Sequence, residues 1–446
     1  MKKAMWFGLA VAGGLIVGAS GLYLKSKTST PDEMMNLSPR SNDASASAEY
    51  LNAQKAVEFY RDAIRKKPDV VTNYVELAQI YIQEARVTAL HHEYFPKADR
   101  LLDKAITLDP NDFNALVTKA SMQATLHHFE EAKALVTRAI ALNPYNAFAY
   151  GVLVDAHVEL GEYDEAVKTC DKMLSIRPDL RSYARASYLR EIHGDIEGAK
   201  QAMQMAGEAG VFGQENRAWA FYNLGKLYLN HGELDKAEFI FNGILQERPN
   251  YAYAFSGLAH IKSVQGNQSE AIHLLKKAWD IAPEHVFLEE LADVYTAAGR
   301  PELASETIER VMQEFSDHVD EGWNVDKEFA YFCANHSINL ERALALAKRD
   351  NNRRPKNIEA LDTYAWVLFK SGKAADALPL IEDVMRFGTM SPTFKFHAGM
   401  IHNAVGDKTK AREYLQAAFN INPFMNTLDA REAKATLAEL TVVASK

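Results

Sequence analysis

An all-α solenoid of about ten to eleven stacked helical hairpins is the fold that this 446-residue sequence predicts. Two periodic markers carry the prediction. An alanine recurs at intervals that are mostly 33 or 34 residues, and eight of the fourteen prolines lie twelve residues after one of these alanines. A fixed period of this length is typical of repeat proteins, whose units bury their apolar surface against neighbouring units. The alanines are Ala56, Ala98, Ala132, Ala166, Ala199, Ala237, Ala271, Ala304, Ala343, Ala377 and Ala411. The prolines are Pro68, Pro110, Pro144, Pro178, Pro249, Pro283, Pro355 and Pro423.

The clearest copy of the unit spans residues 218–249. Its first part, residues 218–229, has apolar residues at helical spacing, and Gly232 then breaks the pattern. A second amphipathic helix follows over 234–248, and Pro249 ends it. Two short helices joined by a tight turn form a helical hairpin, and small residues where the helices cross allow close packing.

This unit resembles the tetratricopeptide repeat family. The matching residues are Leu224, Gly225, Tyr228, Ala237, Phe241 and Pro249, whereas Phe221 stands in place of the tryptophan typical of the family. The resemblance extends over about residues 50–425. It implies a right-handed superhelix whose inner face is lined mainly by the first helix of each hairpin. It also implies a function in holding a peptide or protein on that face.

Residues 1–24 are expected to form a transmembrane anchor or a signal peptide. Lys2 and Lys3 precede an uncharged apolar run from Ala4 to Leu24 that is long enough to span a bilayer. The run continues beyond the small residues around Ala19 that suit signal peptidase, which favours an uncleaved anchor. The lysine distribution favours a single pass through a bacterial cytoplasmic membrane, with the array in the periplasm. Cleavage near Ala19 would instead give a soluble periplasmic protein.

Two further expectations concern the segment before the repeats. Gly14 and Gly18 form a G-x-x-x-G pair, a pattern through which transmembrane helices associate into a homo-oligomer. Residues 25–48 are rich in Ser, Thr, Pro, Asn and Asp and lack an apolar period, so we expect a flexible tether.

The repeat array is expected to occupy residues 49–425 and to depart from its period at defined places. A glycine-rich segment predicts a wide turn and a break in the array near 207–217, and residues 315–324 predict a second wide turn. Residues 426–446 are expected to form a C-terminal capping helix and tail, which would cover the apolar end of the stack.

The candidate binding groove follows from carrying the inner stripe of the unit 218–249 through the other first helices. Aromatic rings there offer rigid area for the side chains of a peptide, and polar groups would fix its register by hydrogen bonds. The same rings would alternatively pack against the next repeat. The candidate groove residues are Phe148, Tyr188, Trp219, Tyr222, Lys226, Tyr253, His260, Phe332, Asn335, Trp366 and Phe369.

The sequence offers no candidate for a catalytic, cofactor or metal site. It has no nucleophile elbow, phosphate-binding loop or zinc-protease motif, and the repeats leave no segment for a catalytic domain. Several histidines lie near turns, but stacked helices are too far apart for neighbouring turns to share a zinc ion. Cys170 and Cys333 occupy core-type helical positions and are expected to be buried thiols. A net charge of −9 argues against nucleic acid as a partner.

Together these features predict a non-catalytic scaffold at the bacterial cell envelope that binds a peptide or protein partner in its concave groove. The alternative is a glycan-binding accessory subunit of an envelope machine that makes or exports polysaccharide, because aromatic rings also stack on sugars.

Overall fold

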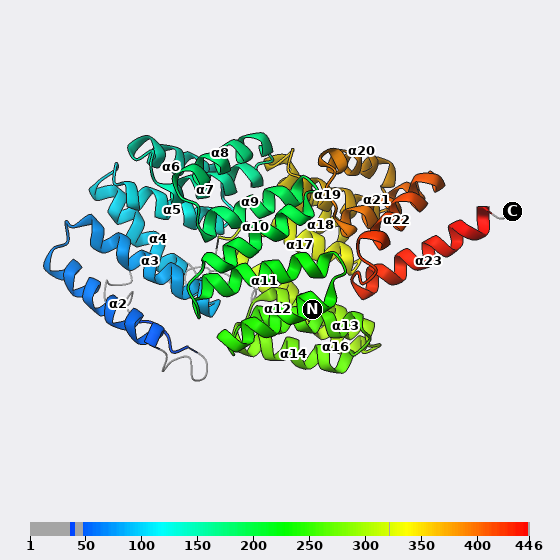
Figure 1. Cartoon of the computed structure of the whole chain (residues 1–446), viewed down its shortest axis with the longest axis horizontal. Helices are drawn as coiled ribbons and strands as arrows, with labels where there is room; N and C mark the ends of the chain where they lie inside the picture. Colours follow the sequence, from blue (N-terminus) through cyan, green and yellow to red (C-terminus); the bar gives the residue numbers. More distant parts are fainter. Residues whose placement is uncertain (1–35, 41–47, 321, 445–446) are drawn as a thin grey trace, which may run out of the picture.

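The computed structural model describes residues 36–40, 48–320 and 322–444. Over these residues the chain is an all-helical solenoid without strands, in which successive helices pack as antiparallel hairpins (Figure 1). A single helix, α2 (Ala48–Lys66), begins the array, and α23 (Thr427–Ala444) follows the last hairpin. The all-α hairpin solenoid expected from the sequence is therefore confirmed.

Ten hairpins lie between α2 and α23 in the described part of the chain. Their first helices are α3 (Val71–Thr88), α5 (Phe113–Thr125), α7 (Ala147–Glu159), α9 (Leu180–Ile192), α11 (Glu215–Asn230), α13 (Ala252–Val264), α15 (His285–Ala297), α17 (Asp326–Asn335), α19 (Ile358–Lys370) and α21 (Pro392–Ala404). Their second helices are α4 (His91–Leu108), α6 (Phe129–Leu142), α8 (Tyr163–Ile176), α10 (Ile196–Ala209), α12 (Leu234–Glu247), α14 (Gln268–Ile281), α16 (Pro301–Asp320), α18 (Leu340–Arg353), α20 (Ala374–Val384) and α22 (Lys408–Ile421). The 3₁₀ turn η2 (Met385–Phe387) extends α20.

Helix boundaries follow local capping chemistry. The side chains of Asp112, Asn146 and Asn357 each accept a hydrogen bond from the backbone N–H three residues on, and so cap α5, α7 and α19. Between the two helices of a hairpin, a glycine adopts a left-handed conformation that other residues enter only with strain. Gly161 and Gly372, both with φ of 75°, are examples.

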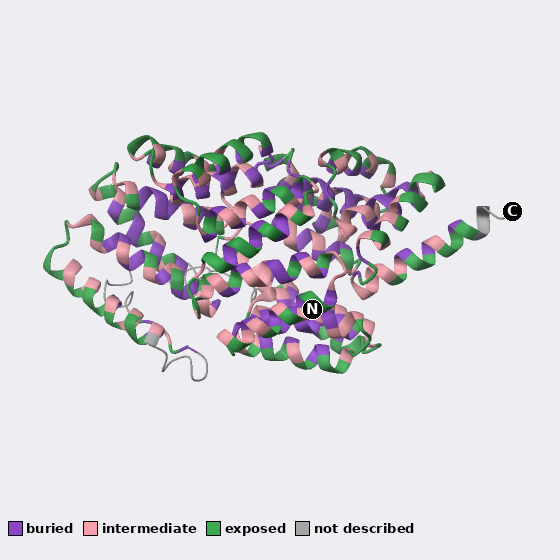
Figure 2. Cartoon of the chain, viewed as in Figure 1, coloured by how far each residue is buried: buried purple, intermediate pink, exposed green. Residues whose placement is uncertain are grey.

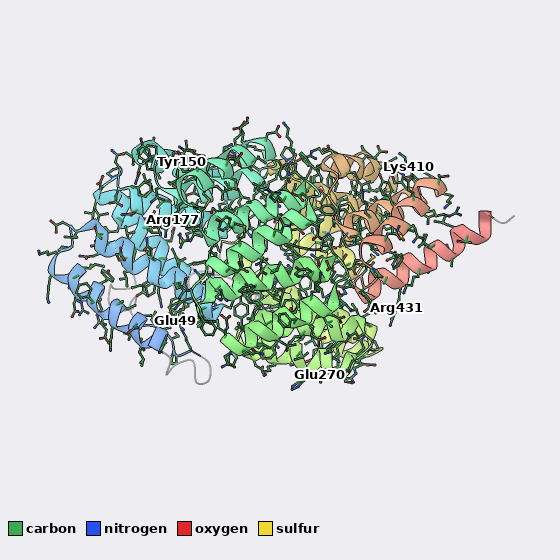
Figure 3. All side chains as sticks on the ribbon, in the orientation of Figure 1. Glu49, Tyr150, Arg177, Glu270, Lys410 and Arg431 are labelled. Carbon is green, nitrogen blue, oxygen red and sulfur yellow. The ribbon has the colours of Figure 1, made fainter. Side chains whose placement is uncertain are left out.

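The small residues of the repeat lie where helices cross. Ala237 of α12 is fully buried, and the ring of Phe241 lies between Gly225 of α11 and Gly257 of α13. A Cβ atom at Gly257 would be 2.5 Å from Cε2 of Phe241, so packing itself excludes a side chain there. Close packing places the buried residues between the helices, whereas α2 and α14 expose much of their outer surface (Figure 2).

The two irregular junctions differ. At the first, α10 ends at Ala209 and α11 begins at Glu215, which is the wide turn expected near 207–217. At the second, the predicted wide turn over 315–324 is wrong for residues 315–320, because α16 continues to Asp320, and α17 begins at Asp326. Phe315 is fully buried in this helix, and its ring stacks on that of Phe329 with centroids 5.0 Å apart. This packing holds the last turn of α16 in place.

Part of the predicted tether is packed on the array. Residues 36–40 lie against α3 and α4, where the exposed fraction of Leu37 is 6% and that of Arg40 is 8%. Nη2 of Arg40 donates to Oε1 of Glu84 at 2.5 Å. The composition of this segment predicted flexibility, but one apolar side chain and one buried ion pair attach it to the first hairpin.

Distant hairpins make contact with each other in a row that we call the seam. The side-chain amide of Asn357 donates to the carbonyls of Val158 and Glu159 at the end of α7, both at 3.1 Å. Equivalent bonds, also between the end of a first helix and a loop 193 to 198 residues further along, run from Asn324 to Leu126, from Thr389 to Ile192 and from Asn422 to Leu229. Six hairpins therefore complete one turn of the superhelix, and successive turns touch.

The candidate anchor and the C-terminal helix lie at the two ends of the chain. Residues 1–24, with the candidate anchor, Gly14, Gly18 and the cleavage position Ala19, lie outside the described residues. None of the helices within the described ranges is long and apolar enough to cross a membrane. At the other end, α23 buries Ala433 and Leu440 against the core, and Arg431 donates to the carbonyl of Ala297 at 3.1 Å.

Candidate functional site

Two cavities lie along the inner face of the superhelix. The central cavity, of about 510 Å³, takes its helical walls from α9, α11, α15, α17, α19 and α21. The amino-proximal cavity, of about 710 Å³, is lined mainly by α3, α5, α7, α9 and α11. All of these are first helices of their hairpins. The volumes fall in the range of binding pockets for small molecules or for a few residues of a peptide.

A charged cluster lies where the two cavities approach each other. The hydroxyl of Tyr188 donates to Oε1 of Glu359 at 2.9 Å, although 171 residues separate them. Nζ of Lys327 donates to the other oxygen of Glu359 at 2.5 Å. Arg354 pairs with Glu159, which lines the amino-proximal cavity, at 2.5 Å. The inner face of the two superhelical turns is thus bridged by polar contacts.

Burial and neighbouring charges shift the pKa values in this region. Burial raises the pKa of the Glu191 carboxyl to about 7, because the positive charge of Lys226 only partly offsets the loss of hydration. Burial by itself would lower the pKa of Lys327, but Glu359 and Glu328 outweigh it and raise that pKa. Lys327 in turn lowers the pKa of Glu359.

The lining of the central cavity is acidic and aromatic. Its charged residues are Glu191, Glu289, Glu328, Glu359, Asp362, Lys226 and Lys327, and its rings are Tyr188, Tyr331 and Phe394. Oε2 of Glu328 has no hydrogen-bond partner in the described part of the chain. The aromatic rings supply rigid contact area for a ligand, and the carboxylates can accept hydrogen bonds from its polar groups. The lining therefore suits a polar ligand with some apolar surface.

The structure brings four of the predicted groove residues onto these cavities. Tyr188 and Lys226 line the central cavity, and Phe148 and Trp219 line the amino-proximal cavity. The side chains of Tyr188 and Trp219 each expose 36% of their surface. Both rings are held at the cavity surface instead of in the core, so they remain candidates for contact with a partner.

Three predicted residues lie elsewhere on the array. Tyr253 lines a cavity of about 790 Å³ beside the seam, formed by α3, the segment 36–40 and the loops before α13 and α15. Its ring contacts that of Tyr222, with centroids 5.3 Å apart. His260 borders a separate small pocket with Asn426. These residues belong to the inner face but share no cavity with Tyr188.

The remaining four predicted residues make contacts within the array, and two of them are buried in its core. Phe332 and Trp366 are buried in the core, with exposed fractions of 2% and 1%, so neither presents a surface to a ligand. Nε1 of Trp366 donates to Oδ1 of Asn335 at 2.8 Å, and Phe369 stacks on Trp366 at 5.0 Å. The two buried rings are removed from the candidate groove, because adjacent first helices close over them.

Sequence reasoning missed several charged residues of the central cavity, chiefly Glu191, Lys327 and Glu359. Glu359 stands eighteen residues before its repeat alanine, as Trp219 and Phe148 do, so the same register could have found it. Lys327 lies outside the predicted stripe, because α17 begins only at Asp326 and presents its first turn to the cavity.

The histidines near the turns take part in the seam. Nδ1 of His127 lies 3.0 Å from the carbonyl oxygen of Asn324, and the ring of His193 contacts that of Phe387 at 5.2 Å. Among the residues that the structure describes, no group of three or more potential ligands could hold a metal ion. Cys170 and Cys333 are free, buried thiols, as the sequence predicted, and burial raises the pKa of each to about 11.

Comparison with known proteins agrees with the hairpin geometry. Tetratricopeptide repeat profiles match residues 124–190, 219–251 and 393–424. The chain therefore contains tetratricopeptide repeats. Repeats of this family are protein-interaction scaffolds, and the inner face described above is formed in the way that the family resemblance implied.

Similar full-length proteins include cellulose synthase operon protein C of Pseudomonas fluorescens (strain SBW25), which is 23% identical over 319 residues. That match covers 65% of this chain and 24% of the relative. Human protein O-mannosyl-transferase TMTC3 is 23% identical over 251 residues, covering 53% of this chain and 27% of the relative. The chain thus spans about a quarter of the length of these curated relatives.

Solved structures with related repeats were also found. Yeast Tom70 covers 96% of this tetratricopeptide repeat chain and 97% of its own, with 13% identity and a TM-score of 0.36. The type IV pilus biogenesis factor PilW covers 46% of this chain and 94% of its own, with 20% identity and a TM-score of 0.38.

Proposed function

We propose that this tetratricopeptide repeat protein is a non-catalytic scaffold that holds a polypeptide partner on its inner face at the bacterial cell envelope. The observation that carries the proposal is the pair of cavities lined by first helices, where Tyr188 and Trp219 expose their rings. Exposed aromatic side chains in a recess act as anchors in protein interfaces, because they bury much area at little cost in conformational entropy.

Site-specific photo-crosslinking tests the partner surface. A photoreactive phenylalanine analogue is placed at Trp219 or Tyr188 in the full-length protein, in the cells that make it. The matched control is Phe239, which is 81% exposed on the second helix α12. We expect one polypeptide to be captured from both inner positions and not from the control. Capture from Phe239 alone would refute the assignment of the inner face.

The location at the envelope rests on the apolar run from Ala4 to Leu24. A periplasmic array anchored by this run would be digested by protease added to spheroplasts and protected in intact cells. Complete protection in spheroplasts would contradict the proposed orientation. The migration of the mature protein beside a version that lacks residues 1–19 distinguishes an anchor from a cleaved signal.

A second candidate function is glycan binding within a polysaccharide synthesis machine. It is favoured by the similarity to cellulose synthase operon protein C over 65% of this chain and by exposed rings that could stack on sugars. Addition of a soluble cello-oligosaccharide should quench the fluorescence of Trp219, and the change should disappear in Trp219→Leu. An unchanged spectrum at saturating sugar would remove this alternative.

A further inference from the structure

The superhelix has two edges, and the seam covers only part of each. The rest of each edge contacts no other hairpin through the seam in the described part of the chain. One edge consists of the turns within hairpins, and the other consists of the loops between hairpins. Along the seam, turns from α5/α6 to α11/α12 contact loops one superhelical turn later, through Asn324, Asn357, Thr389 and Asn422. These two edges of the same chain are therefore complementary in shape and in hydrogen bonding.

The loops in the seam bury their own apolar and asparagine side chains against the turns that they contact. Phe387 contacts the rings of Tyr163 and His193, with centroids 4.9 and 5.2 Å away. Cδ of Pro423 lies 2.9 Å from the position of a Cβ at Gly232, so the loop sits directly on that turn. Asn357 and Asn422 are buried, with exposed fractions of 2% and 4%.

The loops before α7 and α11, residues 142–146 and 210–214, also carry large apolar side chains, and within the described ranges neither loop is hydrogen-bonded to a turn as the seam loops are. We call them the free loop edge. Their large apolar side chains are among the most exposed of the described residues: Leu142 at 47%, Tyr145 at 79%, Val211 at 69% and Phe212 at 72%. Exposed apolar residues that gather along one edge typically mark an interaction surface.

Two asparagines of the free loop edge repeat the local bonds of the seam asparagines. Oδ1 of Asn146 accepts from the backbone three residues on at 3.1 Å, as Oδ1 of Asn357 does at 2.9 Å. Oδ1 of Asn143 accepts from the backbone two residues on at 3.2 Å, as Oδ1 of Asn422 does at 2.8 Å. In the seam the side-chain amides of Asn357 and Asn422 donate across to a helix end. Those of Asn143 and Asn146 have no partner in the described part of the chain.

The turns of the last hairpins form the matching free turn edge, at residues 336–339, 371–373 and 405–407. Gly372 and Gly406 have φ of 75° and 90°, close to the 75° of Gly161 in the seam. A Cβ at Gly161 would lie 2.5 Å from the backbone nitrogen of Asn357, whereas Cβ atoms at Gly372 and Gly406 would meet nothing within 4 Å. The turns have the seam conformation without a covering loop.

We propose that the free loop edge of one molecule docks on the free turn edge of a second copy and continues the seam between molecules. The occupant is a second copy because the intramolecular seam already shows how these two edges fit. Such contact is heterologous, since two different surfaces meet, and it leaves one edge of each kind open on every dimer. The protein should therefore form a concentration-dependent series of head-to-tail oligomers.

Sedimentation velocity of the full-length protein in a non-ionic detergent tests this proposal. The wild type should shift from monomer to dimer and larger species as its concentration rises. A loop-edge variant, Tyr145→Ser/Phe212→Ser, and a turn-edge variant, Gly372→Arg, should each remain monomeric. The matched control is Phe239→Ser, which removes an equally exposed ring from the outer face of α12 and should associate like the wild type.

Mixing the two variants provides the decisive result. Each variant retains one intact edge, so the mixture should form dimers and stop there. The turn-edge variant Gly406→Arg, in the next hairpin, should behave like Gly372→Arg. Both positions have positive φ, so a lower melting temperature is expected, and a wild-type helical circular dichroism spectrum with a cooperative melt shows that the variants are folded. A wild type that stays monomeric, association that survives in both edge variants, or a mixture without dimers would overturn the proposal.

Discussion

Replacement of Gly161 by alanine tests whether the seam stabilises the superhelix. Gly161 lies in the turn between α7 and α8, and its Cβ would lie 2.5 Å from the backbone nitrogen of Asn357 and 2.7 Å from the carbonyl oxygen of Lys356. These are backbone atoms of another hairpin, so no side-chain rotation relieves the overlap. The seam must open at this point.

The magnitude follows from a matched comparison with Gly372. Both glycines have φ of 75°, so alanine costs each of them roughly 1–2 kcal/mol of conformational strain. Gly161→Ala also separates Asn357 from two carbonyls and the hydroxyl of Tyr163 from the N–H of Ile358. At roughly 0.5–1.5 kcal/mol for each of these three hydrogen bonds, the additional loss is about 1.5–4.5 kcal/mol. Gly372→Ala carries no such loss, because its Cβ would meet nothing within 4 Å.

Hydrogen exchange followed by mass spectrometry measures the effect at the seam. The amide of Ile358 donates to the hydroxyl of Tyr163 at 3.0 Å and should exchange faster in Gly161→Ala. In Gly372→Ala the same peptide should exchange at the wild-type rate. Repeat arrays open locally, so this local measurement is more informative than one melting temperature. Equal exchange around Ile358 in both variants would refute the role assigned to the seam.

Three further predictions concern single groups. Asn357→Asp should accelerate exchange at the end of α7 and lower the melting temperature, because aspartate keeps the cap of α19 but cannot donate to Val158 and Glu159. Asn146→Asp, which keeps the equivalent cap of α7 and lies outside the seam, should change little. Burial raises the pKa values of Glu191 and Glu290 to about 7, above those of the unfolded chain, so their protonation favours the folded state. The melting temperature should therefore rise as the pH is lowered from 8 to 6. The rise should be smaller in the double variant Glu191→Gln/Glu290→Gln, and an equal rise there would assign the effect to other groups. Cys170 and Cys333 should not react with a thiol reagent until the array unfolds, since burial raises the pKa of each to about 11, and rapid reaction of the native protein would contradict their placement.

Local features of the fold were predictable because each depends on residues close together in the sequence. The repeat alanine at Ala237 and the glycine at Gly225 are small because the two helices of one hairpin cross there. Pro249 follows the second helix of the same unit. A failure at this level, the expected turn at residues 315–320, arose because Phe315 packs on Phe329 of the next hairpin, a contact that composition does not reveal.

The candidate site was predictable only in part. Of the inner stripe carried through the repeats, Tyr188, Trp219 and Lys226 line cavities. The same register placed Phe332 and Trp366 there, yet both are buried. Whether a ring at this register faces a cavity or fills the space between first helices depends on the local curvature of the superhelix.

The sequence by itself determined the hairpin, its period and the stacking order, because these follow from apolar spacing and small residues within about 34 positions. Only the tertiary structure decided that six hairpins complete a turn and that Asn357 meets the end of α7. Small rotations between neighbouring hairpins accumulate over nearly 200 residues before the two edges meet. No short-range sequence pattern determines the total rotation. The closure of the seam and the cavities inside it therefore follow only from the assembled array.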